Sequence, residues 1–282
     1  MGYSYKFIDL CSNGYLKQAK LLVEKLPSVV NVSTCDDAFC NACSNGHLKV
    51  AKWLAQIHPS AVNVSANDNR AFRYACVNNH LEVAKWLIHT YPSAVNITAY
   101  DSFAFRNACY RGHLEVAKWL VQIHPSVENI YNYDSAFRLA CENGHLEVAK
   151  WLVDIYPSAI NASANIDNAF RFTCSNGYLE IAKWLIQINP QINVSTCNNY
   201  IFVCACANNR VELIKWLMQI RPYHYIVKLD QSQIKVLRWR IRPIQEVKWL
   251  ERAVPVLAYN SKTLNVFQTL NYDIVRHICG FV

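Results

Sequence analysis

The sequence predicts an all-α solenoid of stacked helix–turn–helix units, with short loops or hairpins between the repeats. The first observation is a ten-residue tract that recurs with few changes, as NGHLKVAKWL, NNHLEVAKWL, RGHLEVAKWL, NGHLEVAKWL, NGYLEIAKWL and NNRVELIKWL. The second is its period of 32 or 33 residues, which is typical of solenoid proteins. The third is that cysteine, tryptophan and proline recur with the same period, as in Cys43, Cys76 and Cys109.

The first helix of each unit is predicted from residues 68–79 of the third unit. Asp68 or Asn69 is a suitable N-cap, and the apolar residues that follow have the i, i+3, i+4 spacing of a buried helix face. We expect this helix to end at Asn79, because Asn and Gly accept the left-handed conformation that closes a helix. The equivalent positions in other units hold Gly14, Gly46, Gly112, Gly144 and Gly177.

The second helix of the same unit should begin near Leu81 and end before Pro92, which cannot continue a helix. Its apolar residues form a broad face, and Glu82 and Lys85 are spaced to pair on the outside. The large Trp86 follows the small Ala84 closely, so we expect the tryptophans to fill space in the scaffold. A single helix pair cannot bury its apolar face, so stability should come from neighbouring units.

Three segments follow from the period. Residues 1–222 hold seven units, and residues 223–258 form a divergent eighth unit or a basic cap, traced by Trp249 and Pro255. Residues 259–282 are a C-terminal helical tail. The net charge is +8, and the segment from 221 to 252 is the most basic part. It suits a polar capping repeat better than a nucleic-acid site, because it contains no recognised nucleic-acid motif.

The order of elements, with Ala-Cys near the end of the first helix and Gly-His-Leu-Glu-Val before the second, resembles the ankyrin-repeat family. The resemblance covers residues 1 to about 222 and implies a non-enzymatic scaffold that binds another protein through its loops and first helices. The first helices depart from the family, since Ala-Phe-Arg replaces Thr-Pro-Leu-His, as at 71–73. We therefore expect Arg73 and its equivalents to pair with the Asp four or five residues earlier. This variant resembles ankyrin proteins of amoeba-infecting giant viruses, which implies a virus–host interaction.

The resemblance also implies where a partner binds, because contact positions in the family are the loop tips and the residues after each Cys of the first helix. In the central units these positions gather aromatic residues and an arginine, the types enriched in interface hot spots. The predicted partner-binding residues are Tyr100, Phe103, Tyr110, Arg111, Tyr131 and Tyr133. Part of this set could instead pack against neighbouring loops.

The last residues, LNYDIVRHICGFV, provide the alternative function. They resemble the opening helix of an F-box, which implies a substrate adaptor that recruits the Skp1 component of a cullin ubiquitin ligase. The residues that carry this likeness are Leu270, Asp273, Ile274 and Ile278. Asn271 stands where the family has Pro, and a simple helix that covers the last repeat explains the same pattern.

Composition and residue spacing argue against a membrane protein, a secreted protein and a metal-binding protein. No apolar stretch reaches the ~18 residues of a membrane span, and the N-terminus has no signal-peptide pattern, so we expect a cytoplasmic monomer that binds no membrane. The cysteines recur a full repeat apart, as small core residues of a reduced protein do. Cys40, Cys43 and His47 occupy repeat positions without a complementary pair, so we expect no metal and no cofactor. Recurring Asn-x-Ser/Thr sequences, as at Asn63 and Asn96, are interpreted as turns.

Overall fold

The computed structural model describes residues 2–59, 62–124, 133–157 and 163–192, and beyond these 201, 204, 205, 208 and 210–220. The chain divides into two compact units, Met1–Ile160 and Asn161–Val282. All elements of the described residues are helical, which confirms the predicted fold class. The eighth repeat or cap and the C-terminal tail lie outside the described residues.

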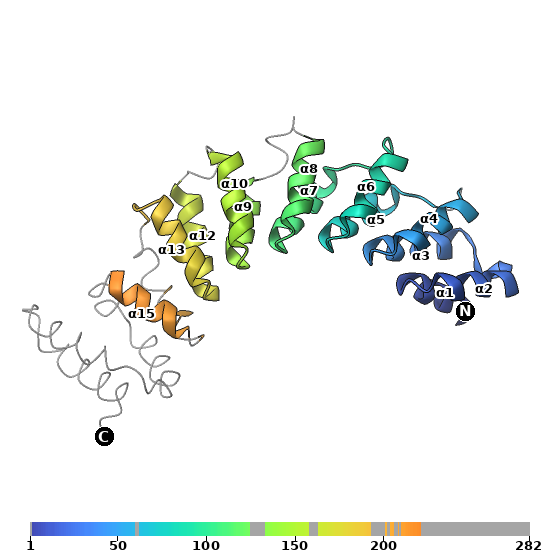
Figure 1. Ribbon diagram of the computed structural model, residues 1–282, viewed down its shortest axis with the longest axis horizontal. Coiled ribbons are helices and arrows are strands. Elements are labelled where there is room, and N and C mark those ends of the chain that lie inside the picture. The colour runs from blue at the N-terminus through green and yellow to red at the C-terminus, as the bar shows by residue number, and fades with distance from the viewer. Residues whose placement is uncertain are drawn as a thin grey trace, which may run out of the picture. The chain divides into compact units, whose positions relative to one another are not determined.

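The helices come in pairs of about equal length along the chain (Figure 1). The first compact unit contains the helices α1 (Gly2–Ser12), α2 (Leu16–Lys25), α3 (Val32–Ser44), α4 (Leu48–Ile57), α5 (Ala66–Val77), α6 (Leu81–Thr90), α7 (Ala99–Tyr110), α8 (Leu114–Ile123), α9 (Tyr133–Glu142) and α10 (Leu146–Ile155). A short 3-10 helix, η1 (Pro27–Val29), follows α2. The second compact unit contains the helices α12 (Ser163–Asn176), α13 (Leu179–Ile188) and α15 (Val211–Ile220). Each first helix packs on its own second helix, and α1, α3, α5, α7 and α9 pack on one another in series.

The start of α5 differs from a simple capped helix. Asn67, Asp68 and Asn69 all have positive φ, between 49° and 60°, so regular helix begins after them. The Asn69 side chain does not cap the helix. It is buried, donates to the Val64 and Ala94 carbonyls at 3.2 and 2.6 Å, and accepts the Asn96 N–H at 3.0 Å. One side chain thus ties the loop before its own helix to the loop before the next.

The turns between paired helices are as the sequence predicts. Asn79 has φ of 66°, and the five glycines at the equivalent positions have φ between 75° and 88°. A second constraint acts at four of these glycines, Gly14, Gly46, Gly112 and Gly177, because a side chain of the next repeat lies directly against them. A Cβ atom on Gly14 would stand 2.6 Å from Nδ1 of His47, and one on Gly112 would collide with His145. At Gly14 and Gly112 glycine is therefore favoured by the close approach of the next histidine as well as by φ.

The loops also bear out the interpretation of the Asn-x-Ser/Thr sequences. Asn63 Oδ1 accepts from the N–H and hydroxyl of Ser65, and Asn96 does the same with Thr98. Asn31 forms a capping box with Thr34 at the start of α3. These asparagines terminate loops by local hydrogen bonds, a role for which their short amide side chain is suited.

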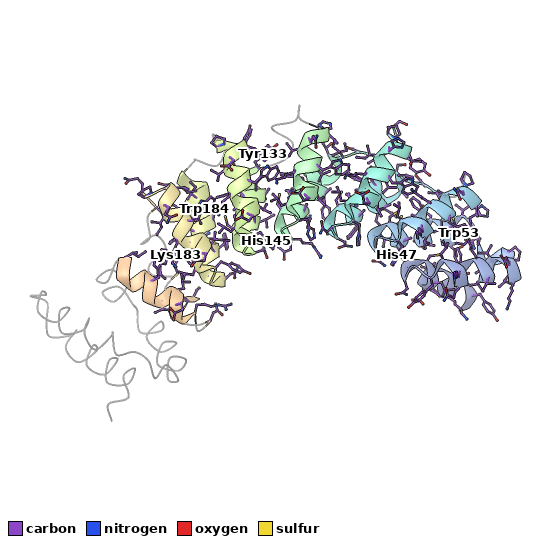
Figure 2. The ribbon with its side chains drawn as sticks, in the orientation of Figure 1. His47, Trp53, Tyr133, His145, Lys183 and Trp184 are labelled. Atoms are coloured by element: carbon purple, nitrogen blue, oxygen red, sulfur yellow. The ribbon has the colours of Figure 1, made fainter. Side chains whose placement is uncertain are left out.

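The core contains phenylalanine rather than tryptophan. Phe39, Phe72 and Phe105 are fully buried in first helices, together with the periodic cysteines. The tryptophans of the second helices, such as Trp53 and Trp184 in Figure 2, are only half-buried. Trp86, Trp119 and Trp151 each contact the phenylalanine of the preceding repeat. Ring centroids lie 6.2 Å apart for Phe39–Trp86, 6.4 Å for Phe72–Trp119 and 6.5 Å for Phe105–Trp151.

The outer sides of the second helices carry ion pairs. Glu82–Lys85 is present at 3.2 Å, as predicted, and the pattern recurs at Glu115–Lys118, Glu147–Lys150 and Glu180–Lys183. Such exposed pairs each contribute a few tenths of a kcal/mol. Among the described residues, no helix is long and apolar enough to cross a membrane.

Candidate protein-binding surface

One face of the first helices changes its chemistry from repeat to repeat. It is formed by positions two residues before the core Phe and two, five and six residues after it, which share one side of a helix. In α7 these positions hold Phe103, Asn107, Tyr110 and Arg111. The core Phe, Ala and Cys on the other sides of the helix scarcely vary, so this face is where repeats differ.

An aromatic–cation cluster lies on this face between α5 and α7. The rings of Tyr74 and Phe103 are 6.1 Å apart. The guanidinium carbon of Arg73 lies 4.9 Å from the Phe103 ring centroid and 5.9 Å from that of Tyr74. Tyr74 is 38% exposed, whereas Arg73 is buried to 9% exposure. The arginine therefore supports two aromatic side chains that still face solvent.

Arg73 is fixed on its other side by the backbone of the left-handed segment. Its Nε donates to the Asp68 carbonyl at 2.8 Å, and its terminal nitrogen donates to the Asn67 carbonyl at 3.0 Å. The expected partner was the Asp68 carboxylate, but these bonds go to main-chain oxygens. Arg138 and Arg171 pair with Glu142 at 3.0 Å and Asn168 Oδ1 at 3.1 Å. Arg73 thereby couples a strained loop to the Tyr74 and Phe103 rings.

The end of α7 extends the same face. Tyr110 is 42% exposed and Arg111 is exposed. In the two preceding repeats the position of Arg111 holds an asparagine that donates to the repeat before it, as Asn45 does to the Ser12 carbonyl and Asn78 to the Ser44 carbonyl, both at 2.8 Å. Arg111 makes no such hydrogen bond within the part of the chain that the structure describes. The Nε2 atom of His113 lies 3.1 Å from the Val77 carbonyl instead.

The histidines before the second helices form a series from His47 to His145, which lie at the turn ends of their helix pairs (Figure 2). Burial lowers the pKa of His80, His113 and His145, and neighbouring histidines lower the pKa of His80 and His113 further. A hydrogen bond to the Tyr110 backbone opposes this shift at His145. Burial thus favours the neutral form of the His80, His113 and His145 rings.

The charge of this face differs between the first two repeats and the next two. On α1 and α3 it carries Asp9 and Asp37, and Asp36 precedes Asp37 in the sequence. Burial raises the pKa of Asp36, and the Asp37 carboxylate also raises it, while the hydrogen bond from the Asn63 N–H and the charge of Arg70 lower it. On α5 and α7 the face is cationic. Arg70 and Arg111 take part in no ion pair within the part of the chain that the structure describes.

The structure places the predicted partner-binding residues in different surroundings. Phe103, Tyr110 and Arg111 lie on the face described above. Tyr133 is 7% exposed, stacks on Tyr156 at 4.5 Å and meets the Phe105 ring edge-on at 5.5 Å, so its ring is not available to a partner.

The other predicted positions cannot be placed in the same way. The backbone of Tyr100 belongs to α7, but its side chain is outside the described residues, as is the whole of Tyr131. The F-box-like residues Leu270, Asp273, Ile274 and Ile278 also lie outside them.

Sequence reasoning missed Tyr74 and Arg70. Their signal was present, because the positions equivalent to Tyr74 in the neighbouring repeats hold Asn41 and Asn107, and the position equivalent to Arg70 holds Asp37. The spacing from the core Phe then puts both side chains on the same face as Phe103. Arg70 belongs to the predicted contact positions before each Ala-Phe pair but was not selected, and Tyr74 lies within the helix, outside both kinds of predicted contact position.

The reactive side chains are arranged as scaffold. All cysteines of the described residues are unpaired, and burial raises the pKa of the Cys11 and Cys40 thiols to about 12 and that of Cys35 to about 11. Within the described ranges, no group of three or more His, Cys, Asp or Glu side chains could hold a metal ion.

Comparison with models of known protein families shows the family of this chain. A family model described as ankyrin repeats (3 copies) matches residues 7–101 and 138–230, and a second, described as ankyrin repeats (many copies), matches residues 105–153. The chain belongs to the ankyrin-repeat family. Ankyrin repeats are in general non-enzymatic scaffolds for protein–protein interaction.

Two further comparisons add detail to this ankyrin chain. The human ASB11 ankyrin repeat domain, a crystal structure, aligns with a TM-score of 0.49 and 16% sequence identity, over 65% of this chain and 83% of that one. A search of curated proteins gives no match.

Proposed function

We propose that this ankyrin chain is a non-enzymatic scaffold that binds a partner protein through an aromatic patch formed by Arg73, Tyr74, Phe103, Tyr110 and Arg111. The patch spans the first helices α5 and α7. Aromatic residues and arginine are the types that carry most binding energy at protein interfaces. A reducing, cytoplasmic setting and a monomeric chain are part of this proposal, and the unpaired cysteines support the former.

The observation that carries the proposal is the solvent-facing pair of Tyr74 and Phe103 over Arg73. An isolated exposed aromatic side chain needs no explanation. Here two rings are held together by a buried arginine, which itself is anchored to main-chain carbonyls. Rings fixed in this way lose little conformational freedom on binding, and this makes them suitable anchors.

Affinity capture from the natural host cell tests the proposal. The wild-type chain is compared with the double variant Phe103→Ser, Tyr110→Ser. We expect partners that bind wild type to be lost from the double variant, since removal of two anchors costs about 2 kcal/mol or more each at a hot spot. Retention of every partner by the double variant would show that the patch is not the binding site.

A matched control separates loss of the patch from loss of aromatic surface in general. Tyr15 is 52% exposed and lies between α1 and α2, away from α5 and α7. The variant Tyr15→Ser should retain the partners. Circular dichroism of both variants checks that the helices are intact.

The adaptor function is the second candidate, and it rests on the sequence of the C-terminal tail alone. Its observation is the spacing of Leu270, Ile274 and Ile278 on one helical face. Deletion of residues 264–282 should then abolish recovery of Skp1 and a cullin but leave the partner of the aromatic patch bound. Failure to recover either component with the full chain would contradict the adaptor function. A virus–host role is proposed on the sequence resemblance alone, and the host-cell capture would identify a host partner.

A further inference from the structure

We propose that the partner segment recognised by the aromatic patch is acidic, with an aspartate or glutamate next to an aromatic or aliphatic side chain. This inference rests on the proposed function, since it describes what binds at the same surface. The inference goes beyond the proposed function because it assigns a negative charge to the partner segment and places that charge over α5 and α7. The observations that carry it are the positions of Arg70 and Arg111 and the acidic residues of the preceding repeats.

Arg70 and Arg111 lie on either side of the aromatic residues. Arg70 is one turn before Tyr74 on α5, at the position that Phe103 occupies on α7. Arg111 directly follows Tyr110 at the other end of α7. Neither guanidinium lies within ion-pair distance of a carboxylate in the described ranges. Both can therefore donate to a carboxylate that a partner brings, and a guanidinium binds a carboxylate through two parallel hydrogen bonds.

The rings between the two arginines determine what accompanies the carboxylate. Phe103 and Tyr74 offer apolar surface 6.1 Å apart at their centroids, so an apolar or aromatic side chain of the partner would contact both. Arg73 lies beneath the Phe103 ring and already uses its nitrogens on main-chain carbonyls. It supports the rings, while Arg70 and Arg111 supply the donors for a carboxylate.

The preceding repeats determine which way the acidic segment lies. Asp9 and Asp37 occupy the same face on α1 and α3, and Asp36 precedes Asp37 in the sequence. A carboxylate placed there would be repelled, whereas one placed over α5 or α7 is attracted. Like charges that meet across an interface disfavour wrong placements, and opposite charges favour the right one. The acidic part of the segment is thus confined to the side of α5 and α7.

The same acidic residues argue against single-stranded nucleic acid as the ligand, although its phosphates and bases would also suit arginine and aromatic side chains. A nucleic-acid strand needs a continuous cationic groove for successive phosphates. In the first compact unit the cationic face is limited to α5 and α7, and α3 interrupts it with Asp37. An acidic protein segment is the occupant that this charge pattern fits.

The experiment selects short random peptides displayed on phage against the full chain. The peptides that bind are sequenced, and the most frequent one is synthesised and titrated by calorimetry. We expect an excess of Asp and Glu next to an apolar or aromatic residue. Binding should weaken between about 0.1 M and about 1 M salt, because the screening length falls from about 10 Å to about 3 Å.

Three variants locate the charge effect. Arg70→Ser and Arg111→Ser should each weaken the peptide about two- to fivefold, as expected for exposed ion pairs. Lys52→Ser is the matched control, because Lys52 is exposed on α4 and takes part in no ion pair among the described residues. It removes the same charge elsewhere and should leave the affinity unchanged.

The results separate the two proposals. Peptides that depend on Phe103 and Tyr110 but show no acidic excess would overturn the acidic-partner inference and leave the aromatic patch in place. Peptides that bind equally to Phe103→Ser, Tyr110→Ser would overturn both. An oligothymidine that binds more tightly than the selected peptide, and depends on Arg70 and Arg111, would overturn the inference in favour of nucleic acid.

Discussion

At the level of single residues, the repeat separates positions that build the core from those that support it. Phe105 is fully buried in α7, whereas Trp119 in α8 is half-buried and covers the Phe72 ring of the preceding repeat. The prediction that tryptophan fills the interior was therefore only partly right. Which side chain is innermost depends on how one repeat meets the next, and the sequence of a single unit does not contain that information.

Substitution of these two residues tests the ranking. Phe105→Ala should lower the free energy of unfolding by about 3–5 kcal/mol, because it leaves a cavity in the core. Trp119→Ala should cost less, about 2 kcal/mol, since part of the side chain already contacts water. Urea unfolding followed by circular dichroism measures both. A larger loss of unfolding free energy for Trp119→Ala than for Phe105→Ala would contradict the assignment of phenylalanine as the core residue.

The turn glycines provide a second test at this scale. Gly112 has φ of 78°, and a Cβ atom there would collide with the His145 ring. Gly112→Ala should destabilise the chain by about 2–4 kcal/mol, from the left-handed backbone and from overpacking together. Adding His145→Ala should relieve only the collision. Gly2→Ala, where nothing lies within 4 Å, should be nearly neutral.

At the level of elements, each repeat is bonded to its neighbour by side chains that reach across. Asn45, Asn78 and the Nε2 atom of His113 lie against carbonyls of the preceding first helix. Asn69 joins the two loops that flank its repeat. The glycine and asparagine turns could be predicted because their cause is local backbone geometry. These contacts between repeats could not, because they depend on packing.

The histidine series makes stability depend on pH. Burial lowers the pKa of His80, His113 and His145 below their value in the unfolded chain, ~6.5. The folded chain then binds fewer protons than the unfolded chain, so this contribution is complete above ~6.5 and is lost as the pH falls through the folded-state values. Urea unfolding between about pH 8 and about pH 5 should show a fall in stability.

Replacement of the three histidines by Gln isolates the effect. The triple variant should lose most of the pH dependence in this window. The exposed His89→Gln serves as control and should keep it. The buried thiols affect wild type and variant alike, because burial raises their pKa values in both chains, so their contribution cancels in the comparison. An unchanged pH profile in the triple variant would contradict the role of the series.

At the level of the whole molecule, function is assigned to departures from the repeat. The periodic Phe, Cys, Gly and Asn residues account for folding. Tyr74 and Arg111 occupy positions where neighbouring repeats hold asparagine, and Phe103 and Tyr110 occupy positions whose residue type changes from repeat to repeat. Phe103, Tyr110 and Arg111 were predicted from the sequence because they lie in the central loops and after the Cys. Tyr133 was included for the same reason, but contacts with Tyr156 and Phe105 from other helices bury it.

The most direct test replaces each departing residue by one found at the same position of another repeat. The variant is Tyr74→Asn, Phe103→Ser, Tyr110→Ser, Arg111→Asn, in which the new residues match Asn41, Ser135, Ser44 and Asn45. Its unfolding free energy and its capture of partners are measured together. We expect stability to change by about 1 kcal/mol or less, as for surface substitutions, and partner binding to be lost. A variant that keeps its partners, or that unfolds, would contradict the separation of scaffold from binding surface.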